Sequence, residues 1–517
     1  MTTEQIDLSA AHDPNWALFL PALSSFYIAG LGKQREGQNY FEATRLPAGI
    51  PDTEVLNFLN SKQALFPYKW ALYSAGHADL TSYKTNASES IVYKREPGSF
   101  ILADSGGFQI LKGQWPADWK DPACPRAMVK RKEVLAWMED IADYGMCLDI
   151  PSQSLRTYHM QDKHGKSLHG IRTIQEAIDA THINNEYFIT NRVGKCKFLN
   201  VMQGLNHSQS DAWYNDMKKY CDPAIYPDTH FNGWAMGGQT KIDVHLLLKR
   251  LIGFIHDGLL VQGKHDWVHC LGTSIVEYAV MFSDVQRAIR KYHNPDLTIS
   301  FDCASPFFGA AKGLCYNNNS FVHDKKWTYS MQKTAENKAY STDTRKFGTA
   351  VLADGIHEFF TDSPVTDRMV LKDLCYRGHG FIGKHGKETK TSWDTLSYTL
   401  IQGHNVYQHM VAVQEANRQY DAGVIPNMLK NNTFDDVTFA GLIDEIFAQK
   451  DRQKSLDLAE KYSRYWMQLK SGQGFSGKKA INSLTMFNAL FTEGDATDSA
   501  EEEYEEDMDI DLIVDEG

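Results

Sequence analysis

The sequence lacks any long hydrophobic run. Hydrophobic residues make up 42% of the 517 residues, but no apolar run approaches the roughly 18 residues that a membrane-spanning helix needs. Residues 1–15 are polar and acidic, without the basic start and apolar stretch of a signal peptide. None of the eight cysteines forms a CxxC pair, which is more typical of a reducing compartment than of a disulfide framework. We therefore expect a cytoplasmic protein with no membrane partner.

Basic residues are missing from the C-terminus. Residues 501–517 carry ten Asp or Glu and no Lys or Arg, so the rest of the chain is close to neutral although its total net charge is −12. Such composition predicts a solvated, disordered tail over residues 496–517. An alternative reading, in which the tail occupies a basic groove until nucleic acid displaces it, stays open.

Eight short β-prone runs alternate with helix-length segments. The runs span residues 17–21, 70–74, 100–103, 146–148, 198–202, 234–236, 267–271 and 297–301, and amphipathic helices are predicted at 127–144, 245–257 and 275–292. This alternation predicts an α/β fold, a (β/α)8 TIM barrel whose ligand site lies at the C-terminal ends of the strands. We assign the barrel to residues 1–305.

The pattern changes after the eighth run. Residues 306–372 read as a long insertion, and 373–495 as a helical subdomain that completes the barrel, with helices at 400–420, 434–450 and 456–470 and a loop at 470–479. The stretch 325–347 mixes six Lys or Arg and two Asp or Glu with four aromatic residues. It fits either nucleic-acid contact through phosphates and stacked bases or an ordinary solvated loop.

Polar residues follow several of the strand-like runs. Asp104 opens the sequence DSGGFQ directly after the run at 100–103. A carboxylate at a strand end, followed by a hydroxyl and two glycines, lets a ligand approach the backbone closely. Further runs end at or near Asp149, Gln203, Gly238 and Asp302. The order and strand position of these residues predict a ligand site at the mouth of the barrel.

These residues resemble the tRNA-guanine transglycosylases and their DNA-directed relatives, which insert 7-deazaguanines into phage or bacterial DNA. The likeness runs from ALFLP at 17–21 to His-Asn at 404–405. Residues 104–109 resemble the family signature, 203–204 its Gln-Gly pair, 233–238 its glycine-rich sixth strand, and 301–303 the segment that bears its nucleophile. The resemblance therefore implies a glycosyltransferase of the pentosyltransferase type that exchanges bases.

Base exchange with retention at a nucleoside C1′ needs one carboxylate as nucleophile and a second acid to move the proton. The resemblance makes Asp302 the nucleophile and Asp104 the general acid/base. The alternative for either residue is a structural role, as a helix cap or as the partner of an Arg.

Guanine recognition needs an acceptor for N1–H and the exocyclic amine and donors for O6. By resemblance, Asp149 is the acceptor, while Gln203 and the backbone N–H of Gly238 are the donors; adenine would leave these groups unpaired. The other substrate-binding residues that the resemblance implies are Ser105, Gly106, Gly237, Phe108 and Leu271. Phe108 and Leu271 would sandwich the base, and core packing is the competing explanation for both.

Zinc is where the sequence departs from the family pattern. The tRNA enzymes carry a C-x-C-x2-C motif and a distant His that hold a structural zinc ion, and His404 stands where that His belongs. At the family spacing, Asp373, Cys375 and His379 replace the three-cysteine motif with a single cysteine. A zinc site made by these four residues is acceptable chemistry. The alternative is a subdomain that has lost the metal.

The departure favours a different polymer from tRNA. We predict a DNA-guanine transglycosylase that acts on flipped or single-stranded guanine and inserts a free 7-deazaguanine such as a preQ0-like base, without an organic cofactor. Its role would be modification of a viral genome against restriction, in the host cytoplasm. A tRNA-guanine transglycosylase, a non-catalytic nucleic-acid-binding barrel and a barrel glycoside hydrolase are the alternatives. The need for an accessory protein or a homodimer stays open.

Overall fold

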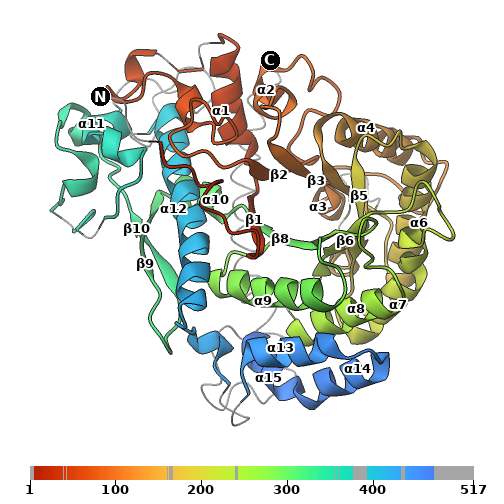
Figure 1. Ribbon diagram of the computed structural model, residues 1–517. Helices are drawn as coiled ribbons and strands as arrows, with labels where there is room; N and C mark the ends of the chain where they lie inside the picture. Colours follow the sequence, from red (N-terminus) through yellow and green to blue (C-terminus); the bar gives the residue numbers. More distant parts are fainter. Residues whose placement is uncertain are drawn as a thin grey trace.

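Eight parallel strands form a nearly closed barrel in the computed structural model (Figure 1). The structure describes residues 5–470 apart from 39, 42, 160, 162–166, 239–242, 354, 359, 377–392 and 432–436. The sheet order is β1-β8-β7-β6-β5-β4-β3-β2, and a single bridge between Ala22 and Leu72 joins its two ends. The strands are β1 (Leu18–Pro21), β2 (Trp70–Ser74), β3 (Phe100–Asp104), β4 (Tyr144–Met146), β5 (Lys197–Met202), β6 (Gly233–Met236), β7 (Trp267–Cys270) and β8 (Thr298–Cys303). The predicted (β/α)8 barrel is confirmed.

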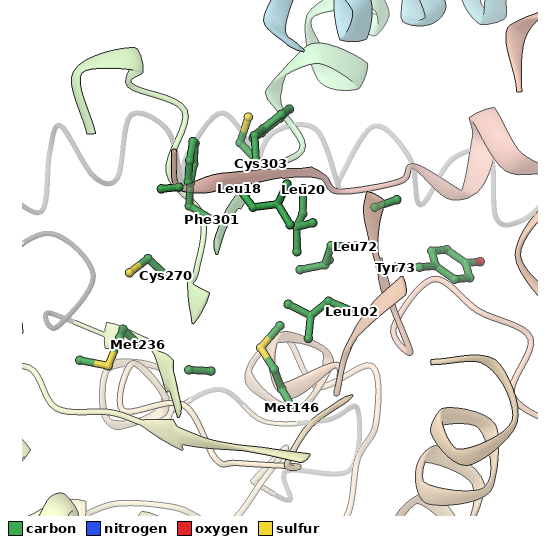
Figure 2. Packing of buried hydrophobic residues seen from close by; sticks show 14 of the residues in the cluster. Leu18, Leu20, Leu72, Tyr73, Leu102, Met146, Met236, Cys270, Phe301 and Cys303 are labelled. Carbon is green, nitrogen blue, oxygen red and sulfur yellow. The ribbon is translucent and has the colours of Figure 1, made fainter. Parts of the chain in front are cut away.

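The strand period of two decides which side chains fill the barrel. Leu20, Leu72, Leu102 and Met146 come from four different strands and point toward one another, whereas Tyr73 points away (Figure 2). The Tyr73 ring instead packs against a tryptophan of helix α4 (Pro125–Ile141) outside the barrel. Side chains at every second position of a strand therefore share the interior, and the last interior position lies at the mouth.

Helices connect consecutive strands and cover the barrel (Figure 1). Before β8 they are α1 (Ser25–Arg35), α2 (Ser90–Tyr93), α3 (Gly107–Leu111), α4, α5 (Ser154–Thr157), α6 (Ile174–Asn191), α7 (His207–Met217), α8 (Val244–His256) and α9 (Val276–Tyr292). The predicted helices at 127–144, 245–257 and 275–292 are confirmed as α4, α8 and α9, each within three residues at either end.

The C-terminal part is helical, as predicted. It contains α11 (Leu371–Leu374), α12 (Thr395–Asp421), α13 (Phe439–Ala448), α14 (Arg452–Lys461) and α15 (Ser463–Lys470). Helix α12 packs on α9 and α1, while α13 contacts α9, and α14 and α15 contact α8. The single helix predicted over 456–470 is two helices, α14 and α15. Two predicted segments lie outside the described residues: the loop at 470–479, apart from residue 470, and the acidic tail.

The region after β8 is more regular than its sequence indicated. It begins with helix α10 (Ser305–Ala311) and an antiparallel hairpin of β9 (Leu314–Ser320) and β10 (Thr328–Lys333), and β9 packs on α12. Two of the aromatic residues considered for base stacking, Trp327 and Phe347, are buried in the core. The stacking interpretation is wrong for these two residues, because the Trp327 ring packs against Phe321 and the Phe347 ring against His357 and Phe360.

None of the helices in the described part of the chain is long and apolar enough to cross a membrane. All eight cysteines are free thiols, which agrees with the expectation that no disulfide framework holds this fold.

Candidate active site at the mouth of the barrel

Asp302 lies at the C-terminal end of β8, and its side chain reaches the barrel mouth. The residue is only 7% exposed. Its Oδ1 accepts a hydrogen bond from the backbone N–H of Gly272 at 2.7 Å and lies 3.1 Å from Nε2 of His269. Two donors from the β7 end therefore hold one oxygen of this carboxylate in place.

His269 was not among the residues predicted from the sequence. It is fully buried inside the barrel, between Trp267 and the mouth. Its Nδ1 lies 2.8 Å from Oγ of Ser300, and the same oxygen accepts from the indole N–H of Trp267 at 2.7 Å. An ionised Asp302 carboxylate can only accept, so Nε2 carries the hydrogen of this bond, and in the neutral ring Nδ1 accepts from the Ser300 hydroxyl.

The strand period contained the signal for this chain of hydrogen bonds. Residues 267, 269 and 271 share one face of the predicted strand, and 300 and 302 share one face of the next. The parallel register pairs His269 with Ser300. A polar residue at an interior barrel position, one pair below a mouth carboxylate, is a positioning candidate that the sequence alone could have indicated.

Asp104 ends β3 at the same mouth. Its Oδ2 accepts from the hydroxyl of Ser74 at 2.6 Å and from the backbone N–H of Gly106 at 3.3 Å. Burial raises the pKa of Asp104 above its ordinary value, and the negative charge of Asp302 raises it further. Asp104 therefore holds a proton more readily than a free carboxyl does.

Asp149 follows β4 and forms the third carboxylate of the site. It is 5% exposed, and its Oδ2 accepts from the side-chain amide of Gln203 at 2.8 Å. Burial raises the pKa of Asp149 to about 7, with a further contribution from the charge of Asp104. The Gln203 amide oxygen in turn accepts from the hydroxyl of Ser152 at 3.1 Å. The structure thus brings Asp149 and Gln203 together, beside Asp104.

Gly237 and Gly238 pack directly against the Gln203 amide. A Cβ at Gly237 would lie 2.8 Å from the amide nitrogen, and one at Gly238 would lie 3.0 Å from the amide oxygen. Gly238 also has a positive φ of 54°, a conformation that favours glycine. These two positions after β6 therefore need glycine so that the backbone can approach Gln203 closely.

The remaining predicted substrate residues surround this site. Ser105 is 1% exposed and its hydroxyl has no hydrogen-bond partner among the described residues, and the same is true of the buried hydroxyl of Thr273 after β7. Gly106 has a φ of 78°. Phe108 and Leu271 are half-buried. Two buried hydroxyls without partners are hydrogen-bonding groups left for a ligand.

The residue at the family's zinc position, His404, is already bonded. It is fully buried; its Nε2 lies 2.8 Å from the carbonyl oxygen of Tyr316 and its Nδ1 2.9 Å from Oγ of Ser363. Burial lowers the pKa of His404 to about 4, so the ring is neutral. One nitrogen donates to the carbonyl and the other accepts from the serine, which leaves no lone pair for a metal.

The other proposed zinc ligands also have separate partners. The carboxylate of Asp373 accepts from the backbone N–H of Val370 at 2.8 Å, and the thiol of Cys375 donates to the carbonyl of Ala335 at 3.4 Å. His379 lies outside the described residues. In the part of the chain that the structure describes, no group of three or more His, Cys, Asp or Glu side chains could hold a metal ion. Asp373, Cys375 and His404 therefore bond to separate neighbours and do not form a zinc centre together.

No protein-family model matches this sequence, and a search of curated proteins found no match either. The function is accordingly argued from the residues at the barrel mouth.

Proposed function

We propose that this protein is a DNA-guanine transglycosylase, which replaces guanine in DNA with a 7-deazaguanine base through a covalent intermediate on Asp302. The observation that carries the proposal is the grouping of Asp104, Asp149 and Asp302 at one barrel mouth, each with a different set of hydrogen-bond partners. Different surroundings give carboxylates different protonation states, and base exchange needs both an ionised and a protonated one.

The first half-reaction uses Asp302 and Asp104. A carboxylate oxygen of Asp302 attacks C1′ of the guanosine nucleotide, a C1′–O bond forms, and the bond from C1′ to N9 breaks. The departing guanine takes up a proton that Asp104 holds. The raised pKa of Asp104 keeps that proton available.

The second half-reaction reverses these steps with a new base. N9 of the incoming 7-deazaguanine attacks C1′ and gives its proton to the Asp104 carboxylate, while the C1′–O bond to Asp302 breaks. Asp302 returns to its ionised state, and the configuration at C1′ is retained. Water takes no part, so the base is exchanged rather than removed.

Asp149 and Gln203 select the base. An ionised Asp149 accepts from N1–H and the exocyclic amine of guanine, and the Gln203 amide that now bonds to Asp149 can donate to O6 after a small rotation. Adenine presents the opposite pattern on this edge and would leave both groups unpaired, which costs about 1–3 kcal/mol for each buried group. DNA is favoured over tRNA because the three-cysteine motif of the tRNA enzymes is reduced here to the single Cys375.

The test is incorporation of radiolabelled guanine and of labelled preQ0 into DNA and, in parallel, into unmodified tRNA. Label in DNA that is lost in Asp302→Asn is the expected result, and denaturing gel electrophoresis should show a protein–DNA adduct in the wild-type protein alone. Label in tRNA only would move the assignment to a tRNA-guanine transglycosylase. Release of guanine without incorporation would indicate a hydrolase, and no reaction with either polymer would refute the proposal.

A further inference from the structure

A shallow groove with an apolar lining lies next to the DSGGFQ segment. It has a volume of about 380 Å³ and is formed by Trp115 with residues of the following loop and of the first turns of α4: Gln114, Pro116, Ala117, Pro125, Arg126, Val129 and Lys130. We call it the Trp115 groove. Its volume is within the range of about 300–1,000 Å³ found for small-molecule sites.

The wall of the Trp115 groove adjoins the segment that carries Asp104 of the candidate active site. A Cβ at Gly106 would lie 2.5 Å from the edge of the Trp115 ring, so the indole lies directly against the Gly106 backbone. The N–H of that same glycine donates to the Asp104 carboxylate. The groove wall therefore packs against the same glycine whose N–H holds a carboxylate of the barrel mouth.

The charge around the groove is positive in an otherwise acidic protein. Residues 112–133 hold six Lys or Arg against three Asp or Glu. Arg126 is exposed and has no hydrogen bond or ion pair with any described residue. Lys130 lies 5.1 Å above the Trp115 ring, although Glu133 neutralises part of its charge through a 2.8 Å ion pair.

A buried cation adds to this potential. Arg131 is fully buried behind the groove, where its guanidinium bonds to Asn184 and to the carbonyl of Trp119 and has one nitrogen, Nη1, without a partner. Within the described residues no carboxylate pairs with it. An apolar lining with an aromatic wall, and at its rim Arg126 without an ion pair among the described residues, is what single-stranded nucleic-acid sites present to a base and its phosphate.

We propose that the Trp115 groove binds a nucleotide adjacent to the target guanine in a single-stranded segment of DNA. Its base stacks on Trp115, and its phosphate pairs with Arg126. This inference rests on the proposed function for its choice of occupant, because the guanine would enter the barrel mouth beside Asp104. A groove that holds the neighbouring nucleotide fixes the strand while the target base is in the mouth.

Binding of a short fluorescein-labelled oligothymidylate, followed by fluorescence anisotropy, tests the groove without any catalysis. Trp115→Ala should weaken binding by about 5- to 150-fold, the range for loss of one base stack, and Trp115→Phe should restore most of it. Arg126→Gln should lower the slope of log affinity against log salt by about 0.7, because one phosphate contact is lost. Exposed residues of α4 that do not line the groove, Met128→Ala and Lys132→Gln, are the matched controls.

Unchanged affinity and salt slope in both groove variants, or equal losses in the controls, would overturn the inference. Activity assays separate its failure from that of the proposed function. If Trp115→Ala exchanges bases with a normal KM for DNA, the groove proposal is refuted and the transglycosylase proposal stands. If binding of the oligothymidylate depends on the groove but no base is exchanged on a guanine-containing strand, the groove proposal stands and the transglycosylase proposal is refuted.

Discussion

His269 offers the sharpest test of how the barrel prepares Asp302. The structure gives Oδ1 of Asp302 two donors, His269 Nε2 at 3.1 Å and the Gly272 amide at 2.7 Å. Replacement of His269 by Leu removes the first donor and keeps an apolar side chain of similar length in the barrel. Of these two donors, only the Gly272 amide would then hold the carboxylate.

The expected loss follows from the strength of one hydrogen bond to a charged group. Such a bond contributes about 1.5–3 kcal/mol, which corresponds to about a 10- to 150-fold slower formation of the covalent intermediate. The assay is single-turnover formation of the protein–DNA adduct at saturating DNA, resolved on a denaturing gel. Because His269 does not contact the base, KM for the free base should stay within about twofold of the wild-type value.

Two further variants separate positioning from folding. His269→Gln retains an N–H donor and should recover part of the rate. Cys270→Ala removes a buried side chain from the opposite face of the same strand, so it should lower thermal stability without slowing adduct formation. A His269→Leu protein that forms the adduct at the wild-type rate would refute the reasoning, as would a Cys270→Ala protein that is equally slow.

Two other predictions follow from the described residues. The pKa of about 7 for Asp149 means that its acceptor form grows from about one-tenth at pH 6 to about nine-tenths at pH 8, so kcat/KM for the free base should rise about ninefold over this interval; Asp149→Asn should be weakly active and lack this rise, and a flat wild-type profile would contradict the role. Since both nitrogens of His404 are bonded to Tyr316 and Ser363, treatment with EDTA should leave the melting temperature unchanged. One equivalent of zinc by elemental analysis, together with a lower melting temperature after chelation, would contradict this.

The sequence predicted the barrel well because burial and strand ends are both visible in it. For seven of the eight strands, the first residue is within about one position of the predicted start and the last residue within about two of the predicted end. The exception is β4, which was predicted at 146–148 and spans Tyr144–Met146. Residues 147–150 are as buried as the strand itself, so apolarity does not mark the point where β4 leaves the sheet. The C-terminal end of β4 is therefore set by its hydrogen bonds to the neighbouring strands and not by hydrophobicity.

The sequence was less informative where the partner of a residue is distant in the chain. Asp104, Asp149 and Asp302 could be placed at strand ends, but Ser74 and His269 gained their significance only from the register between neighbouring strands. Composition was similarly ambiguous for the segment 325–347. An aromatic residue among lysines fits both a surface that stacks bases and a core position, and only the packing of the β9–β10 hairpin distinguished them.

The free energy that it costs to bury three carboxylates at one site is itself an argument for function. A buried carboxylate without a cationic partner is destabilising, and a protein selected for stability alone would pair it or replace it. Among the described residues, Asp104, Asp149 and Asp302 have no Lys or Arg partner. Neutral donors surround them, together with His269 beside Asp302 and His77 near Asp104. Of the structural alternatives considered for Asp104 and Asp302, pairing with an Arg therefore does not account for them. Three such groups kept at one barrel mouth are best explained by a ligand that uses their charge and their protons.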